Sequence, residues 1–363
     1  MRNLRILVAP LDWGLGHATR CIPIIEELIN QGCEVMLAGE GEQEILLKKE
    51  FPMLPFFSLP GYRIRYSVEG SGMVLKMIKQ LPRLQKAIKF ENHWLKQKVI
   101  ELGIDAVISD NRYGLYHKKI PCVFMTHQLT IKSPWKWTER LLQKLNYHYI
   151  NRFTECWVPD FEEKDNLAGE LSHPLKKPGK PVFYTGILSR FKNTGLPEKK
   201  KQLLIILSGP EPQRSIFENM IIHQISTLDV SATVLRGLPS SNTLIPSTDS
   251  IHFHNHLSSE ELNKAMEVAD FVISRSGYST LMEAMALKKK CILVPTPGQT
   301  EQEYLAKYFA EMQYSIYSSQ KNFSIIKMLR SAENFSYRFP STDSKNNLKE
   351  LMRRFLTHFP ISS

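Results

Sequence analysis

One short stretch constrains the fold of this chain more than any other. An apolar run at 271–273 is followed by a Ser/Gly turn, and a helical pattern begins near Ser279. A short apolar run bounded by turn residues is typical of a buried strand. When such a strand leads directly into a helix, the first backbone N–H groups of the helix face the carboxyl end of the strand. Those groups bind phosphate well, so this stretch predicts a phosphate-binding turn.

Two further features accompany this turn. Glu283 stands one turn into the helix, where its carboxylate could reach the hydroxyl pair of a ribose. A second apolar run at 291–295 ends in a polar loop that contains Gln299, Gln302 and Glu303. A phosphate turn, a ribose carboxylate and a Gln/Glu-rich loop together indicate a nucleotide-sugar site, with an ordinary strand–helix turn as the simpler alternative.

At residues 269–306 the chain resembles the family-28 glycosyltransferases of GT-B fold, the MurG-type UDP-N-acetylglucosamine transferases. In that family an Arg-Ser-Gly turn and a helical Glu hold UDP, and a loop rich in Gln contacts the sugar. The resemblance implies an α/β protein of two Rossmann-like, doubly wound parallel-sheet domains that face a central cleft. It also implies N-acetylglucosamine as the donor sugar. The Gln302–Glu303 pair departs from the Gln pair of the cell-wall enzyme, so glucose and galactose stay open.

Other segments enter the predicted donor site through the same resemblance. The turn at 208–214 has one Gly and two prolines where the family has a Gly-rich turn. Arg214 is therefore an alternative phosphate contact, and a plain strand–helix loop is an equal alternative. His256 and Leu257 would flank the uracil base. The predicted donor-binding residues are Gly14, Gly16, Ser208, Gly209, Arg214, His256, Leu257, Arg275, Ser276, Gly277, Tyr278, Ser279, Thr280, Glu283, Gln299, Gln302 and Glu303.

The length of 363 residues and the alternation of apolar runs with helical patterns predict two α/β domains. The alternation lapses in a segment rich in Gly, Pro and Lys, which predicts a linker. The resemblance packs a last helix back onto the first domain. The predicted division is an acceptor domain at 1–165, a linker at 166–201, a UDP-sugar domain at 202–335 and a C-terminal helix at 336–363. Strand-like runs occupy 5–10, 34–38, 56–59, 106–109, 122–126, 156–158, 203–208, 232–235, 251–254, 271–274 and 292–294.

The turn after the first strand carries the candidate catalytic residues. Gly14 and Gly16 let the backbone approach a ligand, and His17 follows them as a helix opens. The resemblance places such a histidine at the cleft, where neutral imidazole could take the proton of an acceptor hydroxyl. Asp12 is an alternative base or a partner for His17, and Asp110 is a second alternative base. A histidine that caps the helix or binds phosphate is the simpler interpretation.

No metal and no cofactor besides the donor substrate is expected. His252, His254 and His256 alternate along a strand, which puts three imidazoles on one face. No nearby Cys, Asp or Glu completes a first coordination shell, so a metal site is not predicted. The five cysteines are scattered without a C-x-x-C pair and are expected to be buried free thiols.

The charge balance limits the partners. There are 47 basic residues and 36 acidic ones, a formal net charge of +11, which favours an anionic lipid or a phosphate-bearing substrate. Nucleic acid is not expected, because no nucleic-acid-binding motif appears. No apolar run approaches the ~20 residues of a membrane-spanning helix, and no signal peptide is recognised, so a cytoplasmic protein is expected.

The segment at 73–100 is both basic and apolar, with Glu91 as its single acidic residue. Pro82 is expected to divide it into two helices. Such a segment could lie on the inner face of an anionic membrane, with Trp135 and Trp137 as further anchors. A solvated surface face is the alternative.

These observations predict an inverting glycosyltransferase that moves a hexose or N-acetylhexosamine from a UDP-sugar to an acceptor, lipid-linked or soluble. A UDP-sugar 2-epimerase would use the same fold and donor, but it needs acid and base carboxylates from both domains that the sequence does not assign. A non-catalytic nucleotide-sugar-binding module is the second alternative, and the Gly14-x-Gly16-His17 turn argues against it. The oligomeric state is left open.

Overall fold

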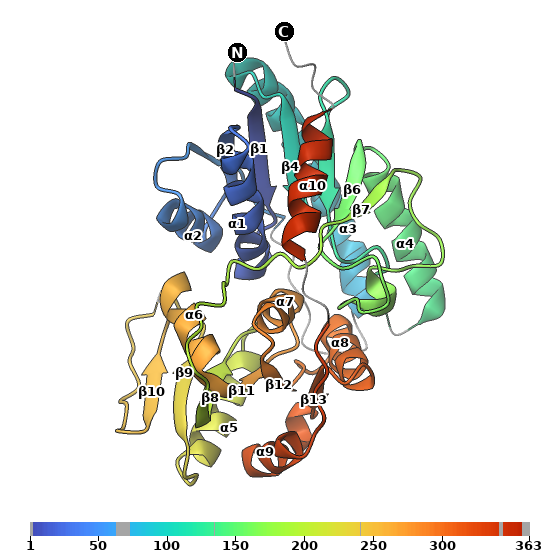
Figure 1. The fold of residues 1–363 in the computed structure, drawn as a ribbon. Coiled ribbons are helices and arrows are strands. Elements are labelled where there is room, and N and C mark those ends of the chain that lie inside the picture. Colours follow the sequence, from blue (N-terminus) through green and yellow to red (C-terminus); the bar gives the residue numbers. More distant parts are fainter. Residues whose placement is uncertain (1–2, 63–72, 134, 240, 341–343, 358–363) are drawn as a thin grey trace. The chain divides into compact units, whose positions relative to one another are not determined.

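The computed structural model describes residues 3–62, 73–133, 135–239, 241–340 and 344–357, with side chains described from 82 in the helix that begins at 73 and from 347 in the last helix. The chain divides into two compact units, Met1–Leu188 with Asp343–Ser363, and Ser189–Thr342 (Figure 1). The division falls inside the segment 166–201 that the sequence predicts as a linker. Each unit is built around its own parallel sheet, so the predicted α/β class with two Rossmann-like units is confirmed.

The first unit contains a seven-stranded sheet of order β3-β2-β1-β4-β5-β6-β7, and neighbouring strands pair in parallel. Its central strands are almost wholly apolar because both faces are covered. In β1, Ile6 and Val8 belong to the core on one face, and Leu7 and Ala9 belong to the core on the other. The elements are β1 (Arg5–Pro10), α1 (Leu15–Asn30), β2 (Glu34–Gly39), α2 (Glu42–Glu50), β3 (Phe56–Ser58), α3 (Met73–Leu102), β4 (Ala106–Asp110), β5 (Cys122–Met125), α4 (Lys136–Ile150), β6 (Glu155–Val158) and β7 (Val182–Tyr184).

The second unit contains a six-stranded parallel sheet of order β10-β9-β8-β11-β12-β13. Leu203, Ile205 and Ile273 lie at the centre of its core, together with Phe217 from α5. The elements are β8 (Lys199–Ile206), α5 (Gln213–Ile225), β9 (Ser231–Leu235), β10 (Ile251–His254), α6 (Ser259–Val268), β11 (Ala269–Ser274), α7 (Tyr278–Ala286), β12 (Lys290–Leu293), α8 (Thr300–Glu311), β13 (Ser315–Tyr317) and α9 (Ile325–Glu333).

Both sheets have a point where the strand order reverses. In the first, the chain runs outward from β1 to β3 and then returns to β4, beside β1. In the second, it runs outward from β8 to β10 and returns to β11, beside β8. The loops that leave two such neighbouring strands diverge, and the crevice between them at the carboxyl edge is where open α/β sheets bind ligands. The predicted catalytic turn follows β1, and the predicted phosphate turn follows β11.

The last helix, α10 (Ser344–Leu356), packs within the first unit, where it lies against α1 (Figure 1). Phe355 is fully buried and meets the ring of Trp157 edge to face, with 5.4 Å between ring centroids. Arg354 donates to the carboxylate of Glu155 at 2.7 Å. The chain therefore returns to its first sheet after completing the second unit.

The expectation that Pro82 divides the segment 73–100 into two helices is wrong. A single helix, α3, runs from Met73 to Leu102 with Pro82 inside it. Proline removes one intrahelical hydrogen bond, but the segment after it is anchored on the sheet. Ile88 and Leu95 are buried, and Asn92 donates to two backbone carbonyls of the loop after β4. Among the described residues, no helix is long and apolar enough to cross a membrane.

Candidate active site

His17 lies in the first turn of α1, and the sheet order of the first unit brings Asp110 beside it. Asp110 is the last residue of β4, and Pro10 of β1 is its register partner. His17 Nδ1 and Asp110 Oδ2 are 3.1 Å apart. The Asp110 side chain is fully buried, whereas 13% of the His17 side chain is exposed. The buried carboxylate therefore contacts the Nδ1 side of the ring. Solvent or a substrate can reach the exposed part of the imidazole.

Arg20 lies three residues after His17 on α1 and binds the same carboxylate. Its Nε donates to Asp110 Oδ2 at 2.7 Å, and its Nη2 donates to Oδ1. Its Nη1 is 3.0 Å from Nδ1 of His127, which follows β5. Burial alone would raise the pKa of Asp110, but the charge of Arg20 and the contact with His17 outweigh it and lower this pKa to about 2. Asp110 is therefore ionised throughout the physiological pH range.

The contacts of His17 Nδ1 define two proton arrangements. Nδ1 lies 3.1 Å from Asp110 Oδ2 and 2.9 Å from Nη2 of Arg20. A ring nitrogen that carries a proton can only donate, here to the carboxylate, and one without a proton can only accept, here from the guanidinium. When Nδ1 carries the proton, Nε2 keeps its lone pair. That arrangement is the one a general base needs.

Asp12 is not the partner of His17 in this structure, contrary to one of the sequence-based expectations. Its Oδ1 accepts a hydrogen bond from the backbone N–H of Tyr62 at 3.2 Å. A Cβ on Gly61 would lie 1.9 Å from the Asp12 carboxylate, so only glycine allows the loop after β3 to approach so closely. Asp12 thus anchors the loop after β3 at the edge of the sheet. Asp110, and not Asp12, is the carboxylate beside His17.

One glycine of the turn after β1 has a left-handed backbone. Gly14 is the N-cap of α1 with a φ of 80°, a left-handed conformation that favours glycine. Gln43 of α2, which is buried, donates to the carbonyl oxygens of Leu11 and Gly14 and so holds the turn from the outside. Gly16 supplies the carbonyl oxygen that accepts a hydrogen bond from Thr19.

In the second unit, the turn after β11 leads directly into α7, as the sequence predicts. Gly277 is the N-cap and gives the helix no side-chain hydrogen bond. A Cβ built on Gly277 would meet no described atom within 4 Å, so the space beside Gly277 is open. The first turn of α7 contains the predicted residues Tyr278, Ser279 and Thr280. The positive end of the α7 dipole therefore lies at the switch point of the sheet, beside this open space.

The polar loop after β12 is fastened to this turn. The buried hydroxyl of Ser276 donates to the carbonyl oxygen of Gln302 at 2.7 Å. The side chain of Gln302 accepts from the backbone N–H of Thr296 at 2.9 Å and donates to Gln299 Oε1 at 2.6 Å. The Glu303 carboxylate accepts from a backbone N–H of the same loop at 3.0 Å. The predicted sugar loop and phosphate turn are thus one connected structure.

The loop after β8 approaches the same place. Gly209 has a φ of 104°, and a Cβ on it would lie 3.3 Å from Thr296 Oγ1. Thr296 Oγ1 is buried and has no hydrogen-bond partner among the described residues. Ser208 is half-buried beside it. The loops that leave three adjacent strands, β8, β11 and β12, therefore meet at one edge of the second sheet.

Glu283 of α7 is largely buried, with 10% of its side chain exposed. Its Oε1 accepts a hydrogen bond from Nε of Arg190 at 2.9 Å. Burial raises the pKa of Glu283, and the positive charge of Arg190 opposes that rise. The predicted ribose carboxylate thus already has a cationic partner, which the sequence does not predict.

Known glycosyltransferases are similar to this chain in sequence and in structure. Residues 218–355 match the Glycosyltransferase family 28 C-terminal domain. A Methanosarcina acetivorans protein named as an uncharacterized glycosyltransferase is 24% identical over 338 residues, which cover 86% of this chain and 84% of that protein. A Clostridium perfringens UDP-N-acetylglucosamine--N-acetylmuramyl-(pentapeptide) pyrophosphoryl-undecaprenol N-acetylglucosamine transferase is 24% identical over 329 residues, 87% of this chain and 86% of that protein. The crystal structure of Acinetobacter baumannii MurG superposes with a TM-score of 0.55 at 15% identity, covering 99% of this chain and 100% of that chain.

This chain is a glycosyltransferase of GT-B fold, and its residues 218–355 are similar to the family-28 C-terminal domain.

In this glycosyltransferase, two arginines of the predicted donor site are engaged with the protein itself. Arg275 is buried, its guanidinium lies 4.3 Å from the ring centroid of Phe217, and it donates to Gln320 at 2.6 Å and to the carbonyl oxygen of Val294 at 3.1 Å. Burial lowers the pKa of Arg275 to about 10. The two Nη atoms of its side chain therefore join the strand ends from inside.

Arg214, predicted as an alternative phosphate contact, is held by acidic neighbours. Its Nε donates to Glu211 at 2.6 Å, and its Nη1 lies 3.2 Å from Glu218. Glu211 lies just before α5, and Glu218 lies in its second turn. Two carboxylates compete with any phosphate for this guanidinium, so the structure gives Arg214 a role in fixing the loop after β8.

The predicted base-flanking residues precede α6. His256 is exposed and Leu257 is half-buried, and Ser258 follows them as the N-cap of the helix, with a reciprocal capping box to Glu261. His252 and His254 lie on β10. Within the described part of the chain, no group of three His, Cys, Asp or Glu side chains could hold a metal ion.

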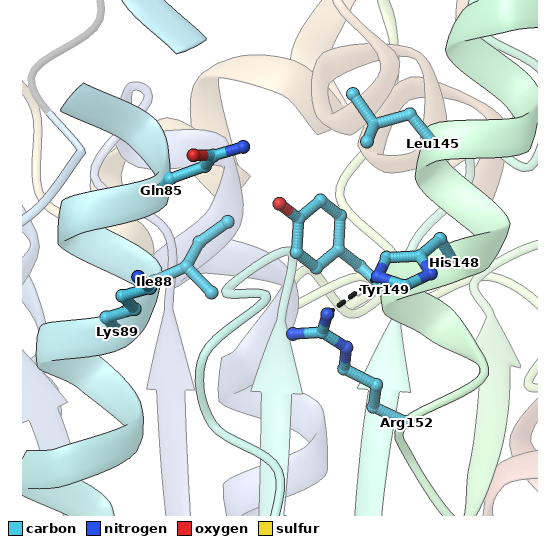
Figure 2. Close-up of a pocket in the computed structure, with 7 residues that line it drawn as sticks. All are labelled: Gln85, Ile88, Lys89, Leu145, His148, Tyr149 and Arg152. Atoms are coloured by element: carbon cyan, nitrogen blue, oxygen red, sulfur yellow. Dashed lines mark hydrogen bonds between the residues drawn. The ribbon is translucent and has the colours of Figure 1, made fainter. Parts of the chain in front are cut away.

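A groove opens between α3 and α4 in the first unit (Figure 2). Its volume is about 320 Å³. Figure 2 shows the ring of Tyr149 at its centre, and the guanidinium of Arg152 lies 4.8 Å from that ring and 2.7 Å from His148 Nε2. The groove thus has an apolar floor and a cationic rim. Its lining residues are Gln85, Ile88, Lys89, Leu145, His148, Tyr149 and Arg152.

Sequence reasoning missed three residues of these sites. Arg20 is spaced for the same helix face as His17, a signal that was available. His127 directly follows the strand-like run at 122–126, and loops at strand ends carry sites in such folds. Arg190 lies in the linker, where no periodic pattern identifies its partner.

Proposed function

We propose that this enzyme is an inverting glycosyltransferase that moves a hexose or N-acetylhexosamine from a UDP-sugar to an acceptor hydroxyl. The observation that carries the proposal is the pairing of His17 with the ionised Asp110 at the switch point of the first sheet. When Nδ1 donates to this carboxylate, Nε2 is the ring nitrogen that can accept a proton. A module that only binds nucleotide sugars has no need of such a nitrogen.

His17 is the proposed general base. The acceptor hydroxyl gives its proton to Nε2 of His17 while its oxygen forms a bond to the anomeric carbon. The bond from that carbon to the diphosphate breaks, and UDP leaves with the electron pair. Attack from the side opposite the leaving group inverts the configuration. Asp110 then faces an imidazolium across 3.1 Å, and this opposite charge stabilises the protonated ring.

The second unit is proposed to hold the donor. The positive end of α7, at Gly277, would meet the charge that develops on the diphosphate. Glu283 would accept hydrogen bonds from the ribose, and Gln302 and Glu303 would contact the sugar. Because fixed backbone dipoles supply the stabilisation, the proposed reaction requires no metal.

We propose a lipid-linked acceptor at the inner face of an anionic membrane. Trp135, Trp137 and Leu141 are exposed by 46%, 62% and 61%, at the start of the helix that forms one wall of the groove. The opposite wall, α3, exposes Lys86 and Lys89. Exposed aromatic and basic side chains together are typical of a membrane-contacting surface. Lys76 and Lys79 of the basic segment 73–100 lie outside the described side chains. The Clostridium perfringens relative is named for an undecaprenol-linked acceptor.

A donor panel tests this function. The enzyme is incubated with UDP- and TDP-linked hexoses and N-acetylhexosamines, with and without a crude lipid extract, and release of the nucleoside diphosphate is measured. The proposal predicts UDP release that requires the extract, persists in EDTA and gives a product of inverted configuration. Conversion of a UDP-sugar to its epimer without UDP release would identify an epimerase instead. Binding of UDP with no turnover on any acceptor would leave only a binding module.

A further inference from the structure

The segment that enters the second unit lies along α6 in a regular pattern. Residues 190, 192 and 194 form hydrogen bonds with residues 259, 263 and 267 of the helix, so a spacing of two in the segment matches a spacing of four in α6. Lys192 and Asn263 exchange two hydrogen bonds, each of 3.0 Å, between the backbone of one and the amide of the other. The three pairs are Arg190 with Ser259, Lys192 with Asn263, and Thr194 with Glu267.

The two repeats match in length. Two residues of extended chain advance about 6.6 Å, and four residues of α-helix advance about 6.0 Å. Three successive pairs can therefore form without distortion. The third pair has two hydrogen bonds, because Glu267 accepts from both the backbone N–H and the hydroxyl of Thr194, at 2.6 and 2.8 Å. We call residues 190–194 the strap; its register along α6 is fixed by these bonds.

This register places Arg190 against the predicted ribose carboxylate. Its Nη1 donates to Ser259 Oγ at 2.8 Å, and its Nε donates to Glu283 Oε1 at 2.9 Å. The guanidinium lies 4.9 Å from the ring centroid of Phe191, and only 11% of the Arg190 side chain is exposed. Arg190 is thus held on three sides and in turn holds one oxygen of Glu283.

We propose that Arg190 is a positioning residue for nucleoside recognition, which orients Glu283 so that its remaining acceptor sites meet the two ribose hydroxyls. This inference rests on the proposed function, in which Glu283 binds the ribose of UDP. An ionised carboxylate has about four lone-pair sites, and Arg190 occupies one, which leaves enough for two hydroxyl donors. Arg190 also supplies the positive charge that favours the ionised form of a buried carboxylate.

Calorimetry with UDP and 2′-deoxy-UDP tests the inference on four proteins: wild type, Arg190→Gln, Arg190→Lys and Thr194→Val. Wild type should bind UDP about ten- to a hundredfold more tightly than the deoxy form, since a hydrogen bond to a charged group is lost. In Arg190→Gln this preference should fall to about threefold or less, and Arg190→Lys should retain part of it. Thr194→Val removes the hydroxyl contact to Glu267, which belongs to the same strap but lies at the other end of α6 from the Arg190 contact. This variant should keep the wild-type preference.

The possible outcomes distinguish a failure of the Arg190 inference from a failure of the proposed function. If Arg190→Gln weakens both nucleotides equally and keeps the preference, or if Thr194→Val loses the preference as well, Arg190 has only a structural role and the inference is overturned. A wild type that binds UDP without discriminating the deoxy form would overturn the ribose assignment of Glu283 and the inference with it. A wild type that binds neither nucleotide would overturn the proposed function itself. Circular dichroism shows whether each variant is folded, and Arg190→Lys keeps the test decisive if Arg190→Gln is not.

Discussion

The two switch points of this molecule are built from the same kind of sheet edge and filled with different chemistry. At the first, charged side chains face one another: Asp110 is fully buried between His17 and Arg20. At the second, the open end of α7 and the backbone of two loops form the edge, and Arg275 is turned inward onto strand-end carbonyls. Proton transfer needs a side chain of fixed orientation, whereas diphosphate binding is well served by backbone dipoles.

The difference suggests a division of labour between the units. Buried charges are costly unless they are paired, and every charge in the cluster around Asp110 has a partner. Such a cluster fixes the orientation of its side chains, which is useful where one of them takes part in a reaction. The second edge consists of a hydrogen-bonded loop and a helix end, neither of which has to gain or lose a proton to bind a ligand. We therefore assign chemistry to the first edge and donor binding to the second, and the predictions below test that assignment.

The largest effect is expected at His17. His17→Ala should lower turnover by roughly 10²–10⁴ while UDP affinity stays close to wild type, because general-base help acts on the transition state. The measurement is steady-state UDP release together with calorimetry of UDP. A histidine that only binds phosphate would give parallel losses in turnover and affinity.

The next effect concerns the stability of the first unit. Asp110→Asn leaves the buried Arg20 without its counter-charge and should lower the free energy of unfolding by about 3–5 kcal/mol at pH 7. Denaturant unfolding measures it. Asp105→Asn is a control, because this carboxylate is only partly buried where it accepts from the backbone N–H of Arg5. A loss at Asp110 no larger than at Asp105 would mean that the pair adds little.

The same pair predicts an acid limb of the stability curve. The folded pKa of Asp110 is about 2, below the value of about 3.9 in an unfolded chain, so its contribution is complete above pH 4 and is lost as the pH falls toward 2. That contribution is about 2–3 kcal/mol. The difference in unfolding free energy between wild type and Asp110→Asn should therefore shrink across this window.

Much of the fold follows from local pattern, and the sites do so only in part. The strands at 5–10 and 251–254 have the bounds that their sequence patterns predict, because both are set by nearby residues. The contact between His17 and Asp110 spans 93 residues and depends on the order of strands in the sheet, which local patterns do not contain. Pro82 is an opposite case, in which packing of the rest of α3 outweighs a local rule.

A smaller effect is expected at the sugar loop. Gln302→Ala and Glu303→Gln should change the relative rates with UDP-glucose, UDP-galactose and UDP-N-acetylglucosamine, because a site that hydrogen-bonds one epimer leaves a group unpaired with another. Each lost contact is worth about 1–3 kcal/mol. If the order and the ratios of the three rates stay unchanged in both variants, this loop does not distinguish the sugars.

The smallest effect per residue is expected at the membrane. Replacing the exposed Arg83, Lys86 and Lys89 by Gln should weaken sedimentation with anionic vesicles, since each basic side chain contributes about 1 kcal/mol near such a surface. Salt should release the wild type in the same way. The matched control replaces Lys199, Lys200 and Lys321 of the second unit, which are also exposed. Equal binding of wild type to neutral and anionic vesicles would mean that α3 presents only a solvated face.

The division of labour itself is tested most directly by measuring turnover and UDP affinity on His17→Ala and Glu283→Ala in parallel. Glu283→Ala removes the proposed acceptor of two ribose hydroxyls and should weaken UDP binding by about 2–4 kcal/mol. His17→Ala should leave UDP binding close to wild type and reduce turnover at saturating donor. The expected result is that Glu283→Ala loses UDP affinity and that His17→Ala loses turnover. Wild-type UDP affinity in Glu283→Ala, or full turnover in His17→Ala, would contradict it.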